Sequence, residues 1–189
     1  MKSYVDGRWQ PLSRVAADRV LARTALGGGV FTTLGVHGSQ PRWLSQHLSR
    51  LAGEAERLGL LGFPFGLLEE LAHRAIRKNG MRRGVVRIGL HGGVRTMAPF
   101  ALCEPPRPTP RHPVLQLVHV DHAPLGGYAK SRHHLRWNSF RDEATARGVF
   151  DLLVVRRGRL TETGRCNLFL ELDGRLCTPP DSEIGRAHV

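Results

Sequence analysis

The chain has 189 residues, 41% of them hydrophobic, and its 28 basic and 16 acidic residues give a formal net charge of +12. This composition is typical of a globular protein and excludes intrinsic disorder, and because no apolar run could cross a bilayer or act as a secretion signal, we expect a cytoplasmic protein without membrane contacts. The basic residues are scattered along the whole length and aromatic residues make up only 6% of the chain, so we expect an anionic small molecule rather than a nucleic acid as the partner.

The first forty residues predict a hairpin followed by a glycine-rich entry into a strand. Tyr4–Leu12 has the pattern of a short hairpin around Asp6-Gly7, and Gly27–Gly29 leads into a strand over Val30–Val36. A tight turn is the simplest interpretation of the three glycines, and a close approach of the backbone to a ligand is the alternative.

Two helices, the first of them amphipathic, and another strand follow. Apolar residues recur at helical spacing over Trp43–Leu60, and a second helix over Leu67–Lys78 stops at Asn79-Gly80. Val85–His91 then alternates as a strand.

A proline-rich segment separates the two halves of the chain. Five prolines occur between residues 105 and 113 and break any regular element there. We therefore predict an amino-terminal α/β domain at residues 1–104, a linker at residues 105–113 and a second domain that begins at residue 114 and reaches residue 180.

The second half predicts several strands and one long helix. In chain order, the expected elements are a strand at Val114–Val120, a helix at Arg132–Arg147, a buried strand at Asp151–Val155, a turn at Arg157-Gly158 before Leu160–Glu162, and a hairpin of Cys166–Leu172 with Arg175–Thr178 across Asp173-Gly174. Helices and strands in both halves predict a fold of the α/β (α+β) class.

The cysteines and histidines form no metal-binding pattern. Cys103, Cys166 and Cys177 are odd in number and lack Cys-x-x-Cys spacing, and the ten histidines include no His-x-x-x-His pair. We therefore expect reduced thiols and no metal site.

Lysine is scarce in this chain, because only three of the 28 basic residues are lysines. One of them, Lys130, follows the turn-rich segment Leu125–Ala129 and precedes a helix. Arginine cannot replace an amine that must lose its proton and attack a carbonyl group. Lys130 is therefore a candidate nucleophile, with a surface cation kept by chance as the alternative.

Four segments occur in the order expected for one known family. They are Asp18-Arg19 with Gly27–Thr33, the run His47–Leu51, Lys130 followed by Glu143-Ala144 and Gly148, and Thr161-Glu162 continuing through Asn167–Phe169 to Thr178–Pro180. Together they resemble the fold-type IV pyridoxal-phosphate enzymes, which include branched-chain and D-amino-acid aminotransferases and aminodeoxychorismate lyase. The resemblance implies a two-domain class IV aminotransferase-like fold with a small amino-terminal α/β domain and an incomplete, β-barrel-like carboxy-terminal domain with helices.

The resemblance also implies pyridoxal 5'-phosphate as the cofactor and assigns residues to it. Lys130 would hold the cofactor aldehyde and later move the proton of the substrate's α-carbon. Arg50 would pair with the phosphate, Glu162 would keep the pyridine nitrogen protonated, and Asn167 lies in the same segment as Glu162.

Two of these residues have simpler interpretations when the resemblance is set aside. Arg50 would then form a solvated i,i+4 pair with Glu54, and Glu162 would be an exposed carboxylate beside Arg159 or Arg165.

Within the family, Thr32-Thr33 after Phe31 and the run Lys130-Ser-Arg-His-His most resemble the lyases. The resemblance implies a homodimer that eliminates pyruvate from 4-amino-4-deoxychorismate, a small amino-acid-like molecule, and leaves 4-aminobenzoate for folate synthesis. The candidate substrate contacts are Thr32, Arg87, His91 and Arg95.

Two alternatives stay open. A class IV aminotransferase acting on branched-chain or D-amino acids would use the same Lys130 and Glu162. A non-catalytic basic binding protein, or an inactive fragment, would account for the charge of +12 without chemistry.

The chain departs from the family pattern at two places. Thr163–Cys166 stands where the family has Gly-Ser-x-Ser, and residues 181–189 do not resemble the loop that completes the family's phosphate site. We therefore expect a carboxy-terminally truncated member of the family, with residues 183–189 of non-native sequence.

Overall fold

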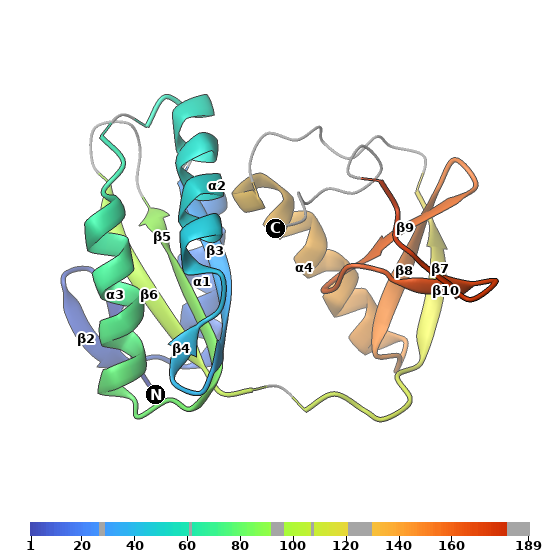
Figure 1. Cartoon of the computed structure of the whole chain (residues 1–189), viewed down its shortest axis with the longest axis horizontal. Coiled ribbons are helices and arrows are strands. Elements are labelled where there is room, and N and C mark those ends of the chain that lie inside the picture. The colour runs from blue at the N-terminus through green and yellow to red at the C-terminus, as the bar shows by residue number, and fades with distance from the viewer. Residues whose placement is uncertain (27–28, 61, 92–96, 107, 121–129, 181–189) are drawn as a thin grey trace. The chain divides into compact units, whose positions relative to one another are not determined.

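The computed structural model describes residues 1–26, 29–60, 62–91, 97–106, 108–120 and 130–180, with side chains from Asn138 onward in the last range (Figure 1). The chain divides into two compact units. The first consists mainly of Met1–Pro108, and the second consists mainly of residues that follow it.

The first unit contains a six-stranded sheet and three helices. The strands are β1 (Lys2–Val5), β2 (Arg8–Pro11), β3 (Val30–His37), β4 (Gln40–Pro41), β5 (Arg83–His91) and β6 (Ala98–Glu104). The helices are α1 (Arg14–Leu26), α2 (Leu44–Arg57) and α3 (Phe65–Lys78). The strand order is β2-β1-β6-β5-β3-β4, and every neighbouring pair is antiparallel.

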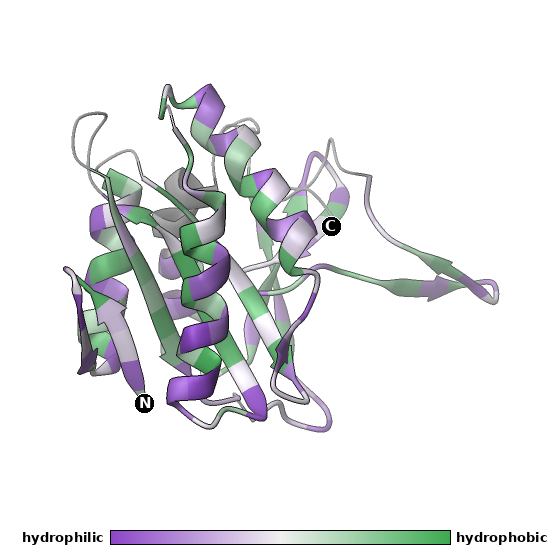
Figure 2. Cartoon of the chain, turned by 60° about the vertical axis from the view of Figure 1, so that its left-hand side comes forward, coloured by the Kyte–Doolittle hydropathy of each residue, from purple (hydrophilic) through white to green (hydrophobic). Residues whose placement is uncertain are grey.

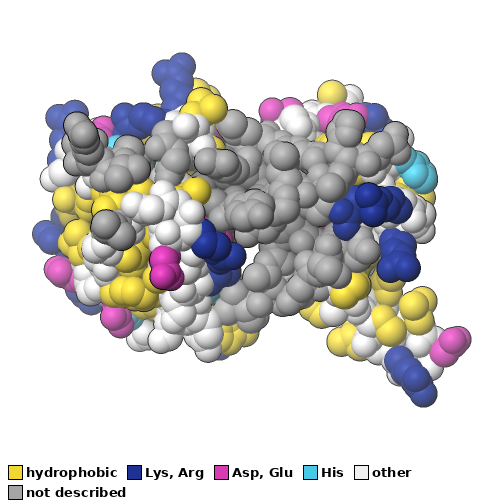
Figure 3. Space-filling model, turned by 90° about the horizontal axis from the view of Figure 1, so that it is seen from above, with side chains coloured by type: hydrophobic (Ala, Val, Ile, Leu, Met, Phe, Trp, Pro, Cys, Tyr) yellow, Lys and Arg dark blue, Asp and Glu magenta, His cyan; other side chains and the backbone are white. Residues whose placement is uncertain are grey.

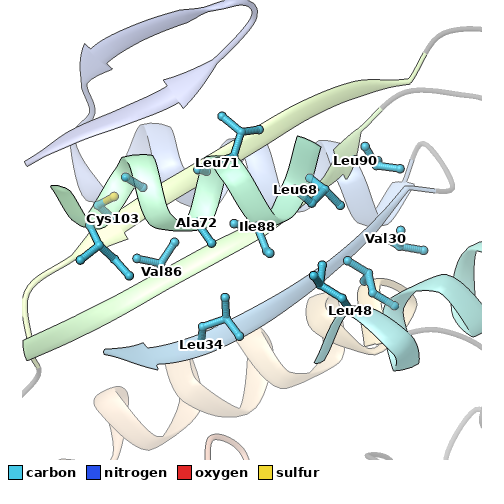
Figure 4. Close-up of a cluster of buried hydrophobic side chains, with 14 of the residues drawn as sticks. Val30, Leu34, Leu48, Leu68, Leu71, Ala72, Val86, Ile88, Leu90 and Cys103 are labelled. Carbon is cyan, nitrogen blue, oxygen red and sulfur yellow. The ribbon is translucent and has the colours of Figure 1, made fainter. Parts of the chain in front are cut away.

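Helices cover both faces of this sheet. Side chains alternate between the two faces of a strand, and Leu34 and Ile88 point to the face where Leu48 of α2 and Leu68 of α3 complete the larger core (Figure 4). The other face packs against α1 through a second cluster that includes Phe100. In Figure 2, hydrophilic and hydrophobic residues alternate along the helices, as expected for helices that pack one side against a sheet.

Helix α1 and strand β6 were not predicted from the sequence. The start of α1 nevertheless carries a local signal, because the Ser13 hydroxyl accepts a hydrogen bond from the Ala16 amide over 3.2 Å, as an N-cap residue does. Strand β6 contains Pro99, which cannot donate a hydrogen bond to a sheet, and its pairing with both β5 and β1 compensates for that weak local preference.

Three predicted turns have the same geometry. Asp6-Gly7, Arg157-Gly158 and Asp173-Gly174 all adopt positive φ at both positions, with values of 52° and 79°, 49° and 75°, and 51° and 72°. Two successive residues with positive φ twist a two-residue hairpin in the sense that its strands require. The predicted hairpins are confirmed.

The second unit contains one long helix and a small sheet. Its elements are β7 (Leu115–His119), α4 (Lys130–Ala146), β8 (Asp151–Arg156), β9 (Arg159–Thr163), β10 (Leu170–Leu172) and β11 (Arg175–Cys177). Strands β7 and β8 are parallel and β8 and β9 antiparallel, while β10 and β11 form a separate hairpin. Phe140 and Ala144 of α4 pack against Leu152 and Val154 of β8. The predicted mixed α/β class is confirmed.

The glycine-rich entry into β3 lies only partly within the described residues. Gly27 and Gly28 fall outside them. At Gly29 a Cβ atom would lie 2.3 Å from the carbonyl oxygen of Leu90, so this glycine allows close packing of two segments of the protein's own backbone. Among the described helices, none is long and apolar enough to span a membrane.

Candidate functional site

Helix α2 and strand β3 bring four polar side chains together. His47, Arg50 and Glu54 recur at i, i+3 and i+7 and therefore share one face of α2. Arg50 forms an ion pair with Glu54, and its Nη2 atom donates a hydrogen bond to Thr32 Oγ1 in β3 over 2.8 Å. The same Thr32 oxygen lies 2.7 Å from Nδ1 of His47.

This cluster is largely shielded from water. Thr32 is fully buried, and the side chains of Arg50 and Glu54 are only 16% and 7% exposed. The sequence suggested a solvated Arg50–Glu54 pair as the simpler alternative; the pair is present, but it is not solvated.

Arg50 is held in place and retains unused donors. A guanidinium group carries five N–H donors, and in the described structure Arg50 directs one to Glu54 and one to Thr32. The remaining donors form a planar, permanently charged fork of the kind that binds phosphate oxygens. The arrangement is therefore chemically suited to an anionic group.

Glu162 lies in β9 and is 2% exposed. Its neighbours Thr161 and Thr163 point to the opposite face of the strand, where their hydroxyl groups donate to the Val154 carbonyl and to the Asp151 carboxylate over 3.1 and 2.8 Å. Since Asp151 is itself fully buried, this bond fixes the end of β9. The alternative of an exposed Glu162 is not what the structure shows.

A tight turn after Glu162 brings Asn167 back beside it. The Thr163 hydroxyl accepts hydrogen bonds from the amides of Arg165 and Cys166 over 3.2 and 2.9 Å, and Glu162 and Asn167 then form an isolated antiparallel bridge. The hydroxyl of Thr163 thus organises the segment in which the sequence departs from the family pattern. The structure places the predicted residues Glu162 and Asn167 next to each other.

The predicted substrate contacts do not form one group. Thr32 is the Cα partner of Ile88, whereas Arg87 is the partner of Thr33. Directly paired residues lie on the same face of a sheet, so Thr32 faces α2 while Arg87 and His91 face the side of α1. Thr33, which lies beside Arg87, was not selected from the sequence, because no local pattern shows which residue of β5 it pairs with.

Arg87 and His91 have partners of their own. Arg87 forms an ion pair with Glu104 on the neighbouring strand. His91 is buried, and its Nε2 atom lies 3.4 Å both from Asp6 and from Arg23. Burial and the charge of Arg23 lower the pKa of His91 from its usual value of 6.5, while Asp6 opposes them.

Two predicted site residues are not fully described. Lys130 is the first residue of α4, and its side chain lies outside the described residues. Arg95 lies entirely outside them. Within the described part of the chain, no three His, Cys, Asp or Glu side chains gather closely enough to hold a metal ion. On the face drawn in Figure 3, the coloured Lys and Arg side chains are dispersed among apolar and neutral ones.

Comparison with solved structures shows the fold. A candidate 4-amino-4-deoxychorismate lyase of Legionella pneumophila matches 85% of this chain with a TM-score of 0.73 at 24% identity, and the match covers 65% of the Legionella chain. The 4-amino-4-deoxychorismate lyase of Pseudomonas aeruginosa is 26% identical over 97% of this chain and 72% of its own, with a TM-score of 0.68. This chain therefore spans about two thirds of the length of such proteins.

A third similar structure is the T.th. branched-chain amino acid aminotransferase, solved with N-(5'-phosphopyridoxyl)-L-glutamate. It is 20% identical, with a TM-score of 0.73 over 97% of this chain and 68% of its own. A comparison with curated protein sequences found no match. The family model for amino-transferase class IV matches residues 29–185. These residues are most of the sequence, and the chain belongs to the amino-transferase class IV family.

Proposed function

We propose that the complete gene product containing this chain binds pyridoxal 5'-phosphate, with Arg50 on the phosphate, Glu162 and Asn167 toward the pyridine ring, and Lys130 as the covalent attachment point. The observation that carries this proposal is the buried Thr32–Arg50–Glu54 arrangement, which holds a charged fork with donors to spare. The buried carboxylate of Glu162 also suits a protonated ring nitrogen. The phosphopyridoxyl compound in the similar branched-chain aminotransferase supports the same choice.

The residues of the chain divide the chemical work. Bound pyridoxal phosphate supplies a ring that accepts electrons from the carbon next to the substrate amine. The Nζ atom of Lys130, as a free amine, takes the proton from that carbon, since an amine can cycle between its two protonation states and a guanidinium cannot. The carboxylate of Glu162 would accept a hydrogen bond from the ring N–H and so favour the protonated ring nitrogen.

The reaction that we favour is the elimination of pyruvate from 4-amino-4-deoxychorismate, which leaves 4-aminobenzoate. Thr32-Thr33 after Phe31 supports this choice, and so does the likeness to the Pseudomonas aeruginosa lyase over 97% of the chain. Formation of an aromatic ring drives the step. The activity belongs to folate synthesis. We place the enzyme in the cytoplasm and propose that it is a homodimer. Its domains lie at residues 1–104 and 114–180.

The decisive experiment supplies 4-amino-4-deoxychorismate to the complete gene product without any keto acid. Stoichiometric release of pyruvate and 4-aminobenzoate is the expected result. Borohydride reduction of the loaded protein followed by peptide mapping should place the cofactor on Lys130, and Lys130→Arg should lose both the adduct and turnover. An adduct on Lys2 or Lys78 would contradict the assignment.

A class IV aminotransferase is the second candidate, favoured by the likeness to the T.th. branched-chain enzyme. It would transfer the amino group of a branched-chain or D-amino acid only when a keto acid is present. Amino transfer that depends on a keto acid, without pyruvate release from aminodeoxychorismate, would select this alternative. Absence of cofactor binding would select a non-catalytic basic protein.

A further inference from the structure

The hydroxyl group of Thr32 is completely enclosed, so its proton and its lone pairs can be assigned. Thr32 is 0% exposed, and the described structure gives its Oγ1 atom two partners, Nη2 of Arg50 at 2.8 Å and Nδ1 of His47 at 2.7 Å. A buried hydroxyl group that leaves its proton without an acceptor loses about 1–3 kcal/mol. Both partners must therefore be consistent with one proton and two lone pairs.

The guanidinium of Arg50 can only donate, so it occupies one lone pair of Thr32. Among the described atoms, the only acceptor left for the hydroxyl proton is Nδ1 of His47. A histidine nitrogen accepts a hydrogen bond only when it carries no proton. A His47 ring that accepts the hydroxyl proton of Thr32 at Nδ1 is neutral and carries its single proton on Nε2.

From this polarity we infer that His47 is a positioning residue for the anion site. Its Nδ1 atom accepts a hydrogen bond from the Thr32 hydroxyl group, and this bond turns a lone pair of Thr32 toward Arg50. The orientation of Thr32 in turn fixes the guanidinium plane. The inference rests on the proposed role of Arg50 as the phosphate ligand. Glu54 holds Nη1 and Thr32 holds Nη2. Two anchors at different nitrogens prevent rotation of the fork, which a single ion pair would allow.

The chain also shows why helix α2 can provide both residues. His47 and Arg50 are three positions apart and lie over the same strand, so one threonine reaches both. A hydroxyl that receives a bond from a cation donates a stronger bond in turn. The His47–Thr32–Arg50 relay is thus a directed chain of hydrogen bonds that ends at the phosphate-binding group.

The first test measures the tautomer of His47 in the cofactor-free complete gene product. The protein is labelled with ¹⁵N at histidine, and the NMR signal of His47 is identified because it disappears in His47→Asn. This signal should show an unprotonated Nδ1 and a protonated Nε2 at neutral pH. Thr32→Val should abolish this preference. A protonated Nδ1 in the unaltered protein would overturn the inference, whatever the protein binds.

The second test compares the binding of pyridoxal 5'-phosphate with that of pyridoxal, which lacks the phosphate. His47→Leu should weaken binding of pyridoxal 5'-phosphate about tenfold, which corresponds to the loss of one hydrogen bond between neutral groups, and should leave pyridoxal binding unchanged. His47→Asn, whose side-chain oxygen can accept near the position of Nδ1, should recover most of the loss, whereas His47→Gln should not. His73→Leu, a histidine change on α3, is the matched control.

The outcomes separate the inference from the proposed function. If the unaltered protein binds both compounds equally, Arg50 does not hold the phosphate and the proposed function fails, while the tautomer measurement still decides the relay. If pyridoxal 5'-phosphate is preferred but His47→Leu and His47→Asn behave alike, acceptance at Nδ1 has no positioning role and the inference is wrong.

Discussion

Burial changes what the ion pair between Arg50 and Glu54 contributes. An exposed pair at this spacing stabilises a helix by ~0.3–0.5 kcal/mol, because water already solvates both charges. Here the two side chains are only 16% and 7% exposed. Each charge has therefore lost most of its contact with water and is stabilised by its partner instead. Glu54 therefore has a structural role in addition to orienting Arg50.

Glu54→Ala should lower the free energy of unfolding by about 2–3 kcal/mol, because it leaves the guanidinium of Arg50 shielded from water without its carboxylate. Urea unfolding followed by circular dichroism measures the change. The control is Glu143→Ala, which breaks an i,i+4 pair with Arg147 in which the side chains are 40% and 37% exposed. That variant should lose less than ~0.5 kcal/mol, and equal losses for the two variants would contradict the argument.

His91 makes stability depend on pH. Its pKa in the folded protein is lowered by burial and by Arg23, against the opposing charge of Asp6, while the ring of Phe100 lies beside it with centroids 5.9 Å apart. The unfolded chain, with a His pKa near 6.5, therefore binds more protons than the folded protein in the window below that value. Stability consequently falls as the pH decreases from 6.5 toward the folded pKa.

We expect the urea midpoint of the unaltered protein to decrease between pH 7.5 and pH 5.5 and the decrease to be smaller in His91→Gln, which cannot take up the proton. The exposed His37 provides the control, and His37→Gln should keep the original slope. A slope that is the same in all three proteins would show that His91 does not cause it.

At the scale of secondary structure elements, the contact between β3 and β5 depends on a missing side chain. A Cβ atom at Gly89 would lie 2.3 Å from the carbonyl oxygen of Val30 and 2.6 Å from Cβ of Phe31. Both atoms belong to the paired strand, which cannot move without disturbing the eight residues of β3. Gly89 is therefore required by packing, and the sequence alone does not distinguish it from other glycines.

Gly89→Ala should destabilise the protein by about 2 kcal/mol or more, because the new methyl group overlaps a strand backbone that the core holds in place. Gly35→Ala, in the partner strand β3, is the control because a Cβ atom there would meet nothing within 4 Å. It should leave stability unchanged or raise it by up to ~1 kcal/mol, since alanine restricts the unfolded chain. Thermal melting of both variants gives the comparison.

At the scale of the whole molecule, the proline-rich segment joins two units that each have their own core. Its described residues, 105, 106 and 108–113, contain no helix or strand, and all of them are exposed. Arg111 in this segment is exposed and is not followed by proline. Arg107 is followed by proline, and trypsin cuts such bonds poorly. Exposed segments without regular structure are where proteases cut first.

Brief digestion of the native protein with trypsin should therefore cut first after Arg111, with the fragments identified by mass spectrometry. The variant Arg111→Gln should delay that cut without exposing a new early site. A first cut at the Arg157-Gly158 turn instead would show that the second unit opens more readily than the linker.

The sequence alone determined the features that depend on near neighbours. Helix α2 followed from an apolar stripe at helical spacing, and the end of α3 followed from the stop signal at Asn79-Gly80. The turns at Asp6-Gly7 and Asp173-Gly174 followed from residues that tolerate positive φ. Each of these signals is contained in a few consecutive residues. The family resemblance likewise rests on short motifs, and the match over residues 29–185 confirms it.

Only the tertiary structure decided which side chains meet. Thr32 and Arg87 were both candidate substrate contacts, yet the register of β3 against β5 puts them on opposite faces of the sheet, because adjacent positions in a strand point in opposite directions. The same register buries Thr32 against α2, where it contacts both His47 and Arg50. Pairing register and helix packing join residues that are distant in the sequence, and no local pattern specifies them.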